Sequence, residues 1–187
     1  GRIGHINKKS ATPVKFSQLS VHKSYDEDYN ADIAILKLKN SLTKFDKDID
    51  KICIANKGKT YPNRQPVVQM GWGLFDNVSS SSETLKTTAL GYLLDKPDCI
   101  AEMKSYADPG QLCVSTLRGE KICAGDSGGP LVVINGADKT AIGIVSYDYY
   151  DWCVQDNEYP TFYTEISYYA DWIKSETKND KEICWKN

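Results

Sequence analysis

Histidine, positive charge and long hydrophobic runs are all in short supply in this sequence. Only 2 of its 187 residues are His, and 23 Lys and Arg stand against 25 Asp and Glu, for a formal net charge of −2. This charge balance argues against a nucleic-acid binder, whose surface is usually basic. No apolar run approaches the about 20 residues that a membrane helix needs, and no basic stretch precedes an apolar one at the start. We therefore expect a soluble chain that contacts neither nucleic acid nor membrane.

Six cysteines are present, an even number, and none belongs to a C-x-x-C pair. Two histidines are too few to build a metal cluster with them, so disulfides in an oxidising compartment are favoured. We expect a secreted, extracellular protein without a metal or another cofactor. Its hydrophobic fraction of 41% is enough for a core of ordinary size.

Short apolar segments with strand spacing recur along the chain, separated by Asn, Asp, Gly, Pro and Lys. They cover residues 14–16, 33–38, 66–71, 88–93, 129–134, 141–146 and 161–164. Residues 97–105 and 166–178 have helical patterns, and the second places apolar side chains three and four residues apart. The pattern predicts a mostly β protein of sandwich or barrel type that ends in a helix.

A serine stands among glycines at residues 123–130, which read CAGDSGGP and precede the apolar run LVVI. A tight turn of this kind exposes the serine hydroxyl while the surrounding backbone N–H groups converge on one point. Such donors stabilise the oxyanion of an acyl-transfer intermediate, and each contributes about 2.7–4 kcal/mol. Taken alone, these letters also fit a glycine-rich turn with an incidental Asp-Ser.

The wider set of motifs resembles the chymotrypsin/trypsin family of serine proteases. CAGDSGGPLV matches that family's nucleophile loop, and NADIAILKL, residues 30–38, matches the segment that carries its triad aspartate. GWG at 71–73, IVSYD at 144–148 and PTFYTEI at 160–166 match in order and spacing. The resemblance covers essentially the whole chain.

This resemblance assigns catalytic roles to single residues. Ser127 would be the nucleophile, and Asp32 would hold the base histidine in the right tautomer and stabilise its imidazolium. The backbone N–H groups of Gly125 and Ser127 would form the oxyanion hole. Asp126 would be the carboxylate that receives an activated amino terminus.

The same resemblance implies an all-β fold of two six-stranded barrels, with the site between them and a C-terminal α-helix. Residues 1–187 would form one trypsin-like peptidase unit. Within it, residues 1–52 would supply the later strands of the first barrel, 53–165 the linker and second barrel, and 166–178 the helix. The first barrel would be incomplete in this chain.

The family's base is a histidine in an Ala-His-Cys motif, whose place counted back from Asp32 falls before Gly1. The two histidines present, His5 and His22, match places without a catalytic role. We expect a companion chain or segment to supply the base, to complete the first barrel and to provide the amino terminus that pairs with Asp126. Without that terminus, Asp126 would be a poorly compensated charge and the oxyanion hole would be unformed.

Three positions would shape the pocket for the side chain before the scissile bond. Its base matches Lys121, where trypsin-like enzymes carry Asp, and its walls, commonly Gly, match Asp148 and Thr161. Lys121 either binds an acidic substrate side chain or pairs with Asp148, which would admit only small residues or close the pocket. Backbone hydrogen bonds to an extended substrate would come from Ser146, Tyr147 and Asp148.

Family pairing of the cysteines would give three disulfides. The resemblance joins Cys99 to Cys113 and Cys123 to Cys153. The remaining pair, Cys53 and Cys184, would hold the carboxy-terminal tail to the linker between the barrels. In many relatives the position of Cys53 bonds to an upstream peptide instead.

A glycosylation triplet and an acidic run are expected at the surface. Asn77 opens the triplet Asn-Val-Ser, an acceptor for N-glycosylation. Residues 26–28 are an acidic run near the segment where some relatives bind calcium, and we expect a solvated loop there without a metal.

Two functions compete. The first is a secreted serine endopeptidase of two chains, with a protein or peptide as substrate and a protein inhibitor as a further partner. Its specificity would be for an acidic or small residue before the scissile bond. The second is a catalytically inactive homologue that keeps the fold to bind or regulate a protein. They differ in whether Ser127 reacts with a serine-directed phosphonate.

Overall fold

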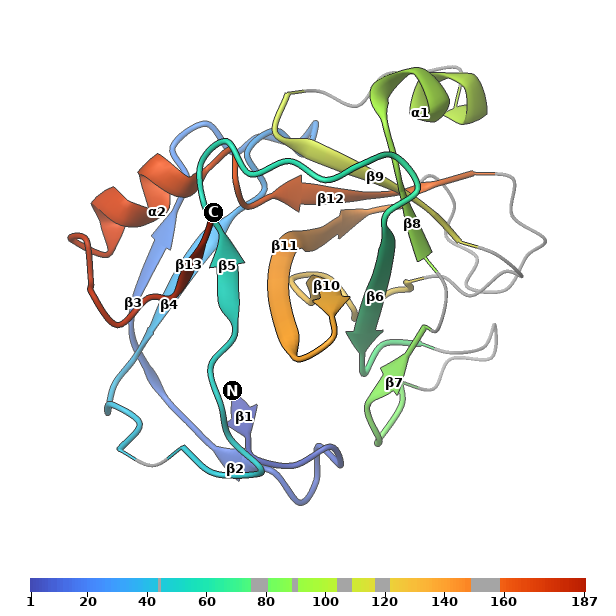
Figure 1. Cartoon of the computed structure of the whole chain (residues 1–187). Helices are drawn as coiled ribbons and strands as arrows, with labels where there is room; N and C mark the ends of the chain where they lie inside the picture. Colours follow the sequence, from blue (N-terminus) through green and yellow to red (C-terminus); the bar gives the residue numbers. More distant parts are fainter. Residues whose placement is uncertain (44, 75–80, 89–90, 104–108, 117–121, 149–158) are drawn as a thin grey trace.

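Six strands from the second part of the chain close into a barrel (Figure 1). The computed structural model describes residues 1–187 except 44, 75–80, 89–90, 104–108, 117–121 and 149–158. The barrel strands are β6 (Pro66–Gly71), β8 (Gly91–Leu94), β9 (Gln111–Thr116), β10 (Pro130–Asn135), β11 (Asp138–Tyr147) and β12 (Thr161–Glu165). Neighbouring strands are antiparallel in the order β10-β6-β8-β9-β12-β11, and β11 pairs with β10 to close the barrel.

The barrel interior is built by the alternation of side chains along these strands, which sends every second residue inward. Val114, Leu131 and Tyr163 are fully buried and belong to one apolar cluster. Burying an aliphatic side chain of this size contributes about 1.5–3 kcal/mol. Burial also raises the pKa of the Tyr163 hydroxyl well above its usual range, so this hydroxyl stays protonated.

Gln69 is a polar exception in this interior. Its side chain is 1% exposed, and its Nε2 lies beside Val67, Val114 and the backbone of Gly91. Within the part of the chain that the structure describes, neither polar atom of its carboxamide has a hydrogen-bond partner. A buried polar group left unpaired costs about 1–3 kcal/mol.

Replacing Gln69 with leucine should therefore stabilise the protein. We expect Gln69→Leu to raise the free energy of unfolding by about 1–2 kcal/mol, because the unpaired amide is removed and a similar volume is kept. Thermal and denaturant unfolding would measure the change, with Gln65→Leu on a half-exposed neighbour as the control. A loss of stability in Gln69→Leu would contradict this account.

The first part of the chain forms two separate two-stranded sheets. Their strands are β1 (Arg2–Ile3) with β2 (Thr12–Pro13), and β3 (Phe16–Val21) with β4 (Ala34–Leu38). One face of β3–β4 carries Leu19, Val21 and Leu36, whose exposed fractions are 61%, 52% and 53%. On the other face, Ile35 packs against the cluster of Ile33 and Ile173. The sheet is therefore covered on one side and open on the other.

Helix α2 (Ala170–Glu176) lies against this covered side (Figure 1). It is shorter than the expected range 166–178, because the N–H of Ile166 bonds to the carbonyl of Ile142 and residues 166–169 form turns. Ala170 and Ile173 are buried on its inner face. The expected helix thus exists, but its first turn is replaced by a continuation of the sheet contacts.

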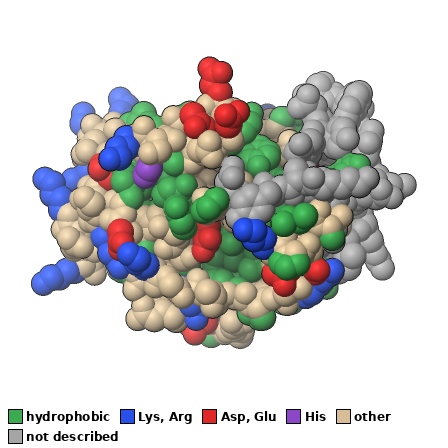
Figure 2. Space-filling model, turned by 90° about the horizontal axis from the view of Figure 1, so that it is seen from above, with side chains coloured by type: hydrophobic (Ala, Val, Ile, Leu, Met, Phe, Trp, Pro, Cys, Tyr) green, Lys and Arg blue, Asp and Glu red, His purple; other side chains and the backbone are tan. Residues whose placement is uncertain are grey.

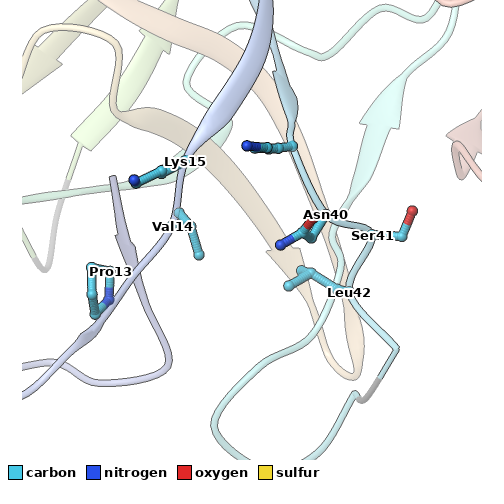
Figure 3. A pocket seen from close by; sticks show the side chains of 7 residues that line it. Pro13, Val14, Lys15, Asn40, Ser41 and Leu42 are labelled. Carbon is cyan, nitrogen blue, oxygen red and sulfur yellow. The ribbon is translucent and has the colours of Figure 1, made fainter.

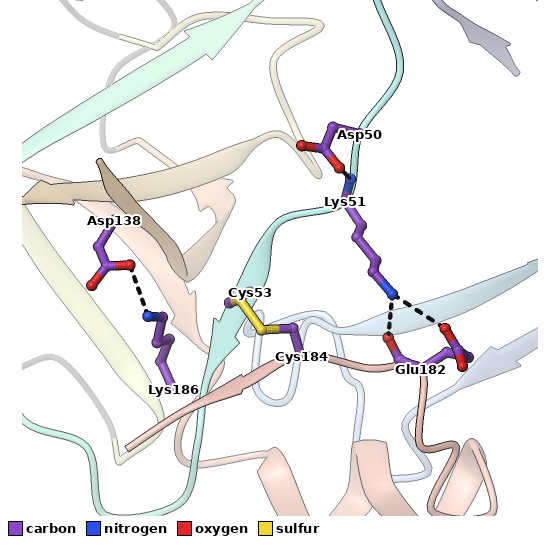
Figure 4. Close-up of a disulfide and its surroundings, with 7 residues drawn as sticks. All are labelled: Asp50, Lys51, Cys53, Asp138, Glu182, Cys184 and Lys186. Atoms are coloured by element: carbon purple, nitrogen blue, oxygen red, sulfur yellow. Dashed lines mark hydrogen bonds and ion pairs between the residues drawn. A yellow bond between two sulfur atoms is a disulfide. The ribbon is translucent and has the colours of Figure 1, made fainter. Parts of the chain in front are cut away.

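The carboxy-terminal tail is bound to the linker in two ways. β13 (Trp185–Lys186) pairs in parallel with β5 (Cys53–Ala55), which itself pairs in parallel with β11. The predicted disulfide between Cys53 and Cys184 is confirmed (Figure 4). Beside it, Lys51 bonds to Glu182 at 3.2 Å and Lys186 to Asp138 at 2.9 Å.

The second confirmed disulfide joins Cys99 to Cys113. Cys99 lies in helix α1 (Lys96–Met103), which matches the start of the helix expected at 97–105, and Cys113 lies in β9. A last short strand, β7 (Lys86–Thr87), pairs with the end of β6. None of the helices seen in the described residues has the length and apolar character needed to cross a bilayer.

Candidate functional site

The loop of Ser127 is a sequence of turns that require glycine. Gly125 and Gly128 have φ values of 94° and 81°, in the left-handed region where other residues are strained. The N–H of Asp126 bonds to the carbonyl of Cys123, and the N–H of Gly129 bonds to the carbonyl of Asp126. Ser127 itself is exposed. The loop thus presents the serine to solvent from a hydrogen-bonded turn.

The carboxylate of Asp126 is partly buried and accepts two hydrogen bonds from the backbone. Its Oδ1 accepts a hydrogen bond from the N–H of Gly73 at 2.8 Å, and its Oδ2 accepts one from the N–H of Cys123 at 2.9 Å. These two backbone N–H groups partly compensate the charge of Asp126. Its pairing with an amino terminus stays a prediction. The side chain also fills the space beside the Cα atom of Gly71, where a Cβ would overlap it.

Asp32 sits at the centre of a tight turn just before β4. The N–H of Ile33 bonds to the carbonyl of Ala31, which is a three-residue turn around Asp32. The hydroxyl of Thr164 donates to the Asp32 carbonyl and the hydroxyl of Ser146 donates to Asp32 Oδ2, both at 2.7 Å. The carboxylate is therefore held from the barrel side by a residue of β11.

The end of β11 brings Asp32 and the serine loop together. Val145 accepts a hydrogen bond from the N–H of Gly128 and donates one to the carbonyl of Gly129. The next residue, Ser146, binds Asp32. Two segments that are far apart in the sequence thus meet at two consecutive residues of one strand.

The two histidines occupy other places. His22 packs edge-on against the rings of Tyr169 and Trp172, with centroids 5.3 and 5.1 Å away, and its Nδ1 accepts the N–H of Ser24. His5 Nδ1 accepts the N–H of Asn7. In the contacts recorded for the described residues, neither imidazole meets Asp32 or Ser127.

An aromatic stack beside the serine loop was not predicted from the sequence. The Tyr147 ring stacks between Tyr29 and Phe162, with centroid distances of 4.9 and 4.8 Å. Tyr29 has a φ of 60°, so its left-handed backbone turns the ring toward Tyr147. The only sequence signal was a tyrosine three residues before Asp32, which by itself indicates nothing about a partner.

Of the three residues expected to shape the pocket, the structure describes the two wall residues, Asp148 and Thr161. Thr161 is 0% exposed, and its hydroxyl oxygen lies 3.5 Å from the carbonyl of Val114 and 3.4 Å from the hydroxyl of Tyr163, so its single proton can be donated to either. The carboxylate of Asp148 is close enough to add to the burial that raises the pKa of Tyr163. Three other predicted residues, Lys121, Cys153 and Asn77, lie outside the described residues. Cys123 is disulfide-bonded, and its pairing with Cys153 stays a prediction.

The acidic run at 26–28 is organised by its own loop. Asp26 accepts hydrogen bonds from the backbone of Asp28 and from the backbone and side chain of Asn30. These bonds, the Asn30 side chain first, lower the pKa of Asp26. In the described part of the chain, no three His, Cys, Asp or Glu side chains gather as metal ligands would.

Comparison with known proteins places the chain among proteases. A family model named Trypsin matches residues 2–173. The chain is 31% identical over 184 residues to transmembrane protease serine 11C of Mus musculus, covering 94% of this chain and 41% of that protein. It is 31% identical over 173 residues to Trypsin-1 of Astacus astacus, covering 91% of this chain and 70% of that one. The chain thus spans less than half the length of the mouse relative.

A solved structure agrees with the sequence matches. Neuropsin, a serine protease expressed in the limbic system of mouse brain, superposes with a TM-score of 0.80 at 26% identity, over 94% of this chain and 78% of that one. The family match over nearly the whole chain, the closed barrel and the placement of Asp32 beside the serine loop lead to one assignment. This chain belongs to the trypsin family of serine proteases.

Proposed function

We propose that this chain is the nucleophile-bearing part of a secreted serine endopeptidase, with its base histidine supplied by a segment outside the chain. The observation that carries the proposal is the convergence of Asp32 and the Ser127 loop on Val145 and Ser146. Ser127 is exposed on a turn that contains glycines, and the Asp32 carboxylate accepts a hydrogen bond from the Ser146 hydroxyl. An added imidazole between them would complete a catalytic triad.

In the proposed reaction, the added imidazole takes the proton of Ser127 as its Oγ attacks the peptide carbonyl. The N–H groups of Gly125 and Ser127 stabilise the oxyanion, and Asp32 stabilises the imidazolium. The C–N bond then breaks, the imidazolium gives its proton to the leaving amine, and an ester remains on Ser127. Water attacks this ester by the same path and releases the acid.

The first two sheets support a companion segment. The exposed apolar face of β3–β4 and its outer edges, which pair with no other described strand, are suited to further strands, since open edges and apolar faces favour added pairing. Nearby, a cavity of about 370 Å³ separates the chain after β2 from the chain after β4, and Val14 and Leu42 point into it (Figure 3). We propose that this segment fills the open side, as part of a two-chain protein.

We further propose an acidic or small residue before the scissile bond. Asp148 and Thr161 stand where many relatives carry glycine, and the Thr161 side chain is buried against Val114 and Tyr163. Lys121 at the base would either attract an acidic side chain or be neutralised by Asp148. The four cysteines in the two described disulfides support a secreted location, because such bonds persist in oxidising surroundings.

The alternative function is a binding protein without catalysis. It is favoured by one observation, that both histidines of the chain pack elsewhere. In this case Ser127 would be an ordinary exposed serine.

Covalent labelling of the native, unreduced protein would distinguish these functions. We expect a fluorophosphonate to transfer its phosphonyl group to Ser127, with loss of fluoride, so that the peptide containing Ser127 carries the label. The Ser127→Ala variant should stay unlabelled. Protein treated beforehand with an unlabelled serine-protease inhibitor should stay unlabelled as well. Denaturing mass spectrometry and amino-terminal sequencing should find a companion with an Ala-His-Cys motif. Labelling absent from the complete native material would overturn the enzyme proposal in favour of the binding protein.

A further inference from the structure

A second cavity, of about 470 Å³, lies away from the serine loop, between the segment before Asp32 and the start of α2. We name it the aromatic groove. His22, Ser24 and Asn30 line one side, and Tyr168, Tyr169 and Trp172 line the other. Among the described residues that line it, none is Asp, Glu, Lys or Arg. In Figure 2 a histidine lies at the surface beside hydrophobic side chains, on a face where such side chains gather between charged ones.

The aromatic rings of the groove form a fixed ridge. His22 contacts Tyr169 and Trp172 edge-on, and Tyr168 contacts Tyr169 edge-on at 5.0 Å between centroids. Tyr169 is buried and anchors the set, whereas the Tyr168 side chain is 56% exposed. Tyr168 lies in the turns just before α2 and Trp172 lies in the first turn of the helix, and both line the groove. The groove thus offers ring surfaces that are already ordered.

Hydrogen-bond donors predominate on these rings. Because His22 Nδ1 accepts the N–H of Ser24, the proton of the neutral imidazole is on Nε2. The Trp172 indole N–H and the Tyr168 hydroxyl add two more donors. Among the contacts of the described residues, these three donors have no protein acceptor. A ligand that matches them carries acceptors, a compact apolar surface and few donors of its own.

The segment 22–31, which forms one rim of the groove, has a net negative charge. Asn30, on the lining, receives its position from Asp26, which accepts three hydrogen bonds within this loop. Glu27 and Asp28 are exposed beside it, and Lys23 is the one basic residue in the segment 22–31. Such a rim attracts basic residues that flank a bound segment.

We propose that the aromatic groove binds a proline-rich segment of a partner protein in the polyproline II conformation, with basic residues next to the prolines. Proline has no N–H, so such a segment presents carbonyl acceptors and flat apolar rings, which fit the donors and aromatic faces of the groove. The segment is extended before binding, so little conformational entropy is lost. An oligosaccharide fits less well, because its hydroxyls donate as often as they accept.

The proposal can be tested by fluorescence polarisation with the native protein. The probe is a labelled twelve-residue peptide with two arginines before a Pro-rich run, and the control peptide has alanine at every proline. We expect saturable binding of the first peptide alone, weakened tenfold or more by Tyr168→Ala and two- to fivefold by Tyr168→Phe, which removes one donor. Tyr25→Ala, a matched tyrosine that is 49% exposed outside the groove, should leave binding unchanged.

A charge variant and a competitor complete the test. Asp28→Asn should weaken binding severalfold at low salt and less at high salt, because the rim acts through screened charge. Each variant is compared by thermal unfolding, so that loss of binding is separated from loss of structure. Equal binding of the alanine peptide, insensitivity to Tyr168→Ala, or binding of an oligosaccharide panel in its place would overturn the proposal. This site is independent of catalysis at Ser127.

Discussion

Asp32→Asn in the complete native protein should lower kcat/KM for peptide hydrolysis by about 10⁴-fold. The reason lies in the hydroxyl of Ser146, which donates to one side-chain oxygen of Asp32 at 2.7 Å. In the variant this hydroxyl selects the amide oxygen and turns the amide NH₂ toward the imidazole. The imidazole must then accept from the amide and carry its proton on the side of Ser127, where it cannot act as a base.

Steady-state kinetics at several pH values would measure this effect, with thermal unfolding as the check on structure. Asp138→Asn, at an exposed carboxylate bonded to Lys186, is the matched control and should change kcat/KM less than twofold. Ser146→Ala should retain the carboxylate and lower kcat/KM by about 10- to 100-fold, because a hydrogen bond to a charged acceptor contributes about 1.5–3 kcal/mol. Activity of Asp32→Asn within tenfold of the parent would show that Asp32 does not orient a base.

Gly71→Ala should destabilise the protein by about 3 kcal/mol or more. A Cβ at this position overlaps Oδ1 of Asp126, so the carboxylate must leave the N–H groups of Gly73 and Cys123. Two buried donors and one charge then lose their partners, and each loss costs about 1–3 kcal/mol. Denaturant unfolding of the oxidised protein would measure the change.

A double-mutant cycle separates this clash from other effects of alanine. Asp126→Ala alone should cost about 2–4 kcal/mol, because the same two N–H groups lose their acceptor. In that background Gly71→Ala should cost less than about 1 kcal/mol, since the overlapping carboxylate is gone. Additive costs in the double variant would mean that Gly71 is required for a reason other than Asp126.

Strands with dense apolar spacing were predictable from the sequence, and short or weakly patterned ones were not. The segment PVVQMG was expected at 66–71 and is β6 at the same residues. β9, QLCVST, was missed because a polar or small residue stands at three of its six positions. β5 and β13 have three and two residues, too few for any period, and form because a disulfide and two strand edges bring them together.

The strand expected at residues 14–16 was predicted at the wrong place for a related reason. Residues 14–16 looked like a strand, yet β3 is Phe16–Val21. Leu19 and Val21 alternate along β3 but lie on its uncovered face. Their spacing therefore marks an apolar surface that stays exposed in this structure.

Site residues were predictable where side-chain identity carries the chemistry. Ser127 and Asp32 were predicted from their motifs, and both segments contact the end of β11. The acceptor role of Asp126 toward Gly73 was not predictable, because every residue but proline has an N–H and the sequence does not distinguish the one that is used. The stacking of Tyr29 on Tyr147 likewise depends on a left-handed backbone that tyrosine rarely adopts.

The disulfide between Cys53 and Cys184 separates the chain into a covalently closed part and an open part. Residues 53–184 form one covalently closed ring that contains the whole barrel and the Ser127 loop. Residues 1–52 have no cysteine and are joined to this ring by one peptide bond. A single backbone cut inside the ring leaves one covalent molecule until a reductant is added. A cut between Asp32 and Cys53 instead leaves Asp32 on a separate peptide, held beside Ser146 and Thr164 by hydrogen bonds and packing alone.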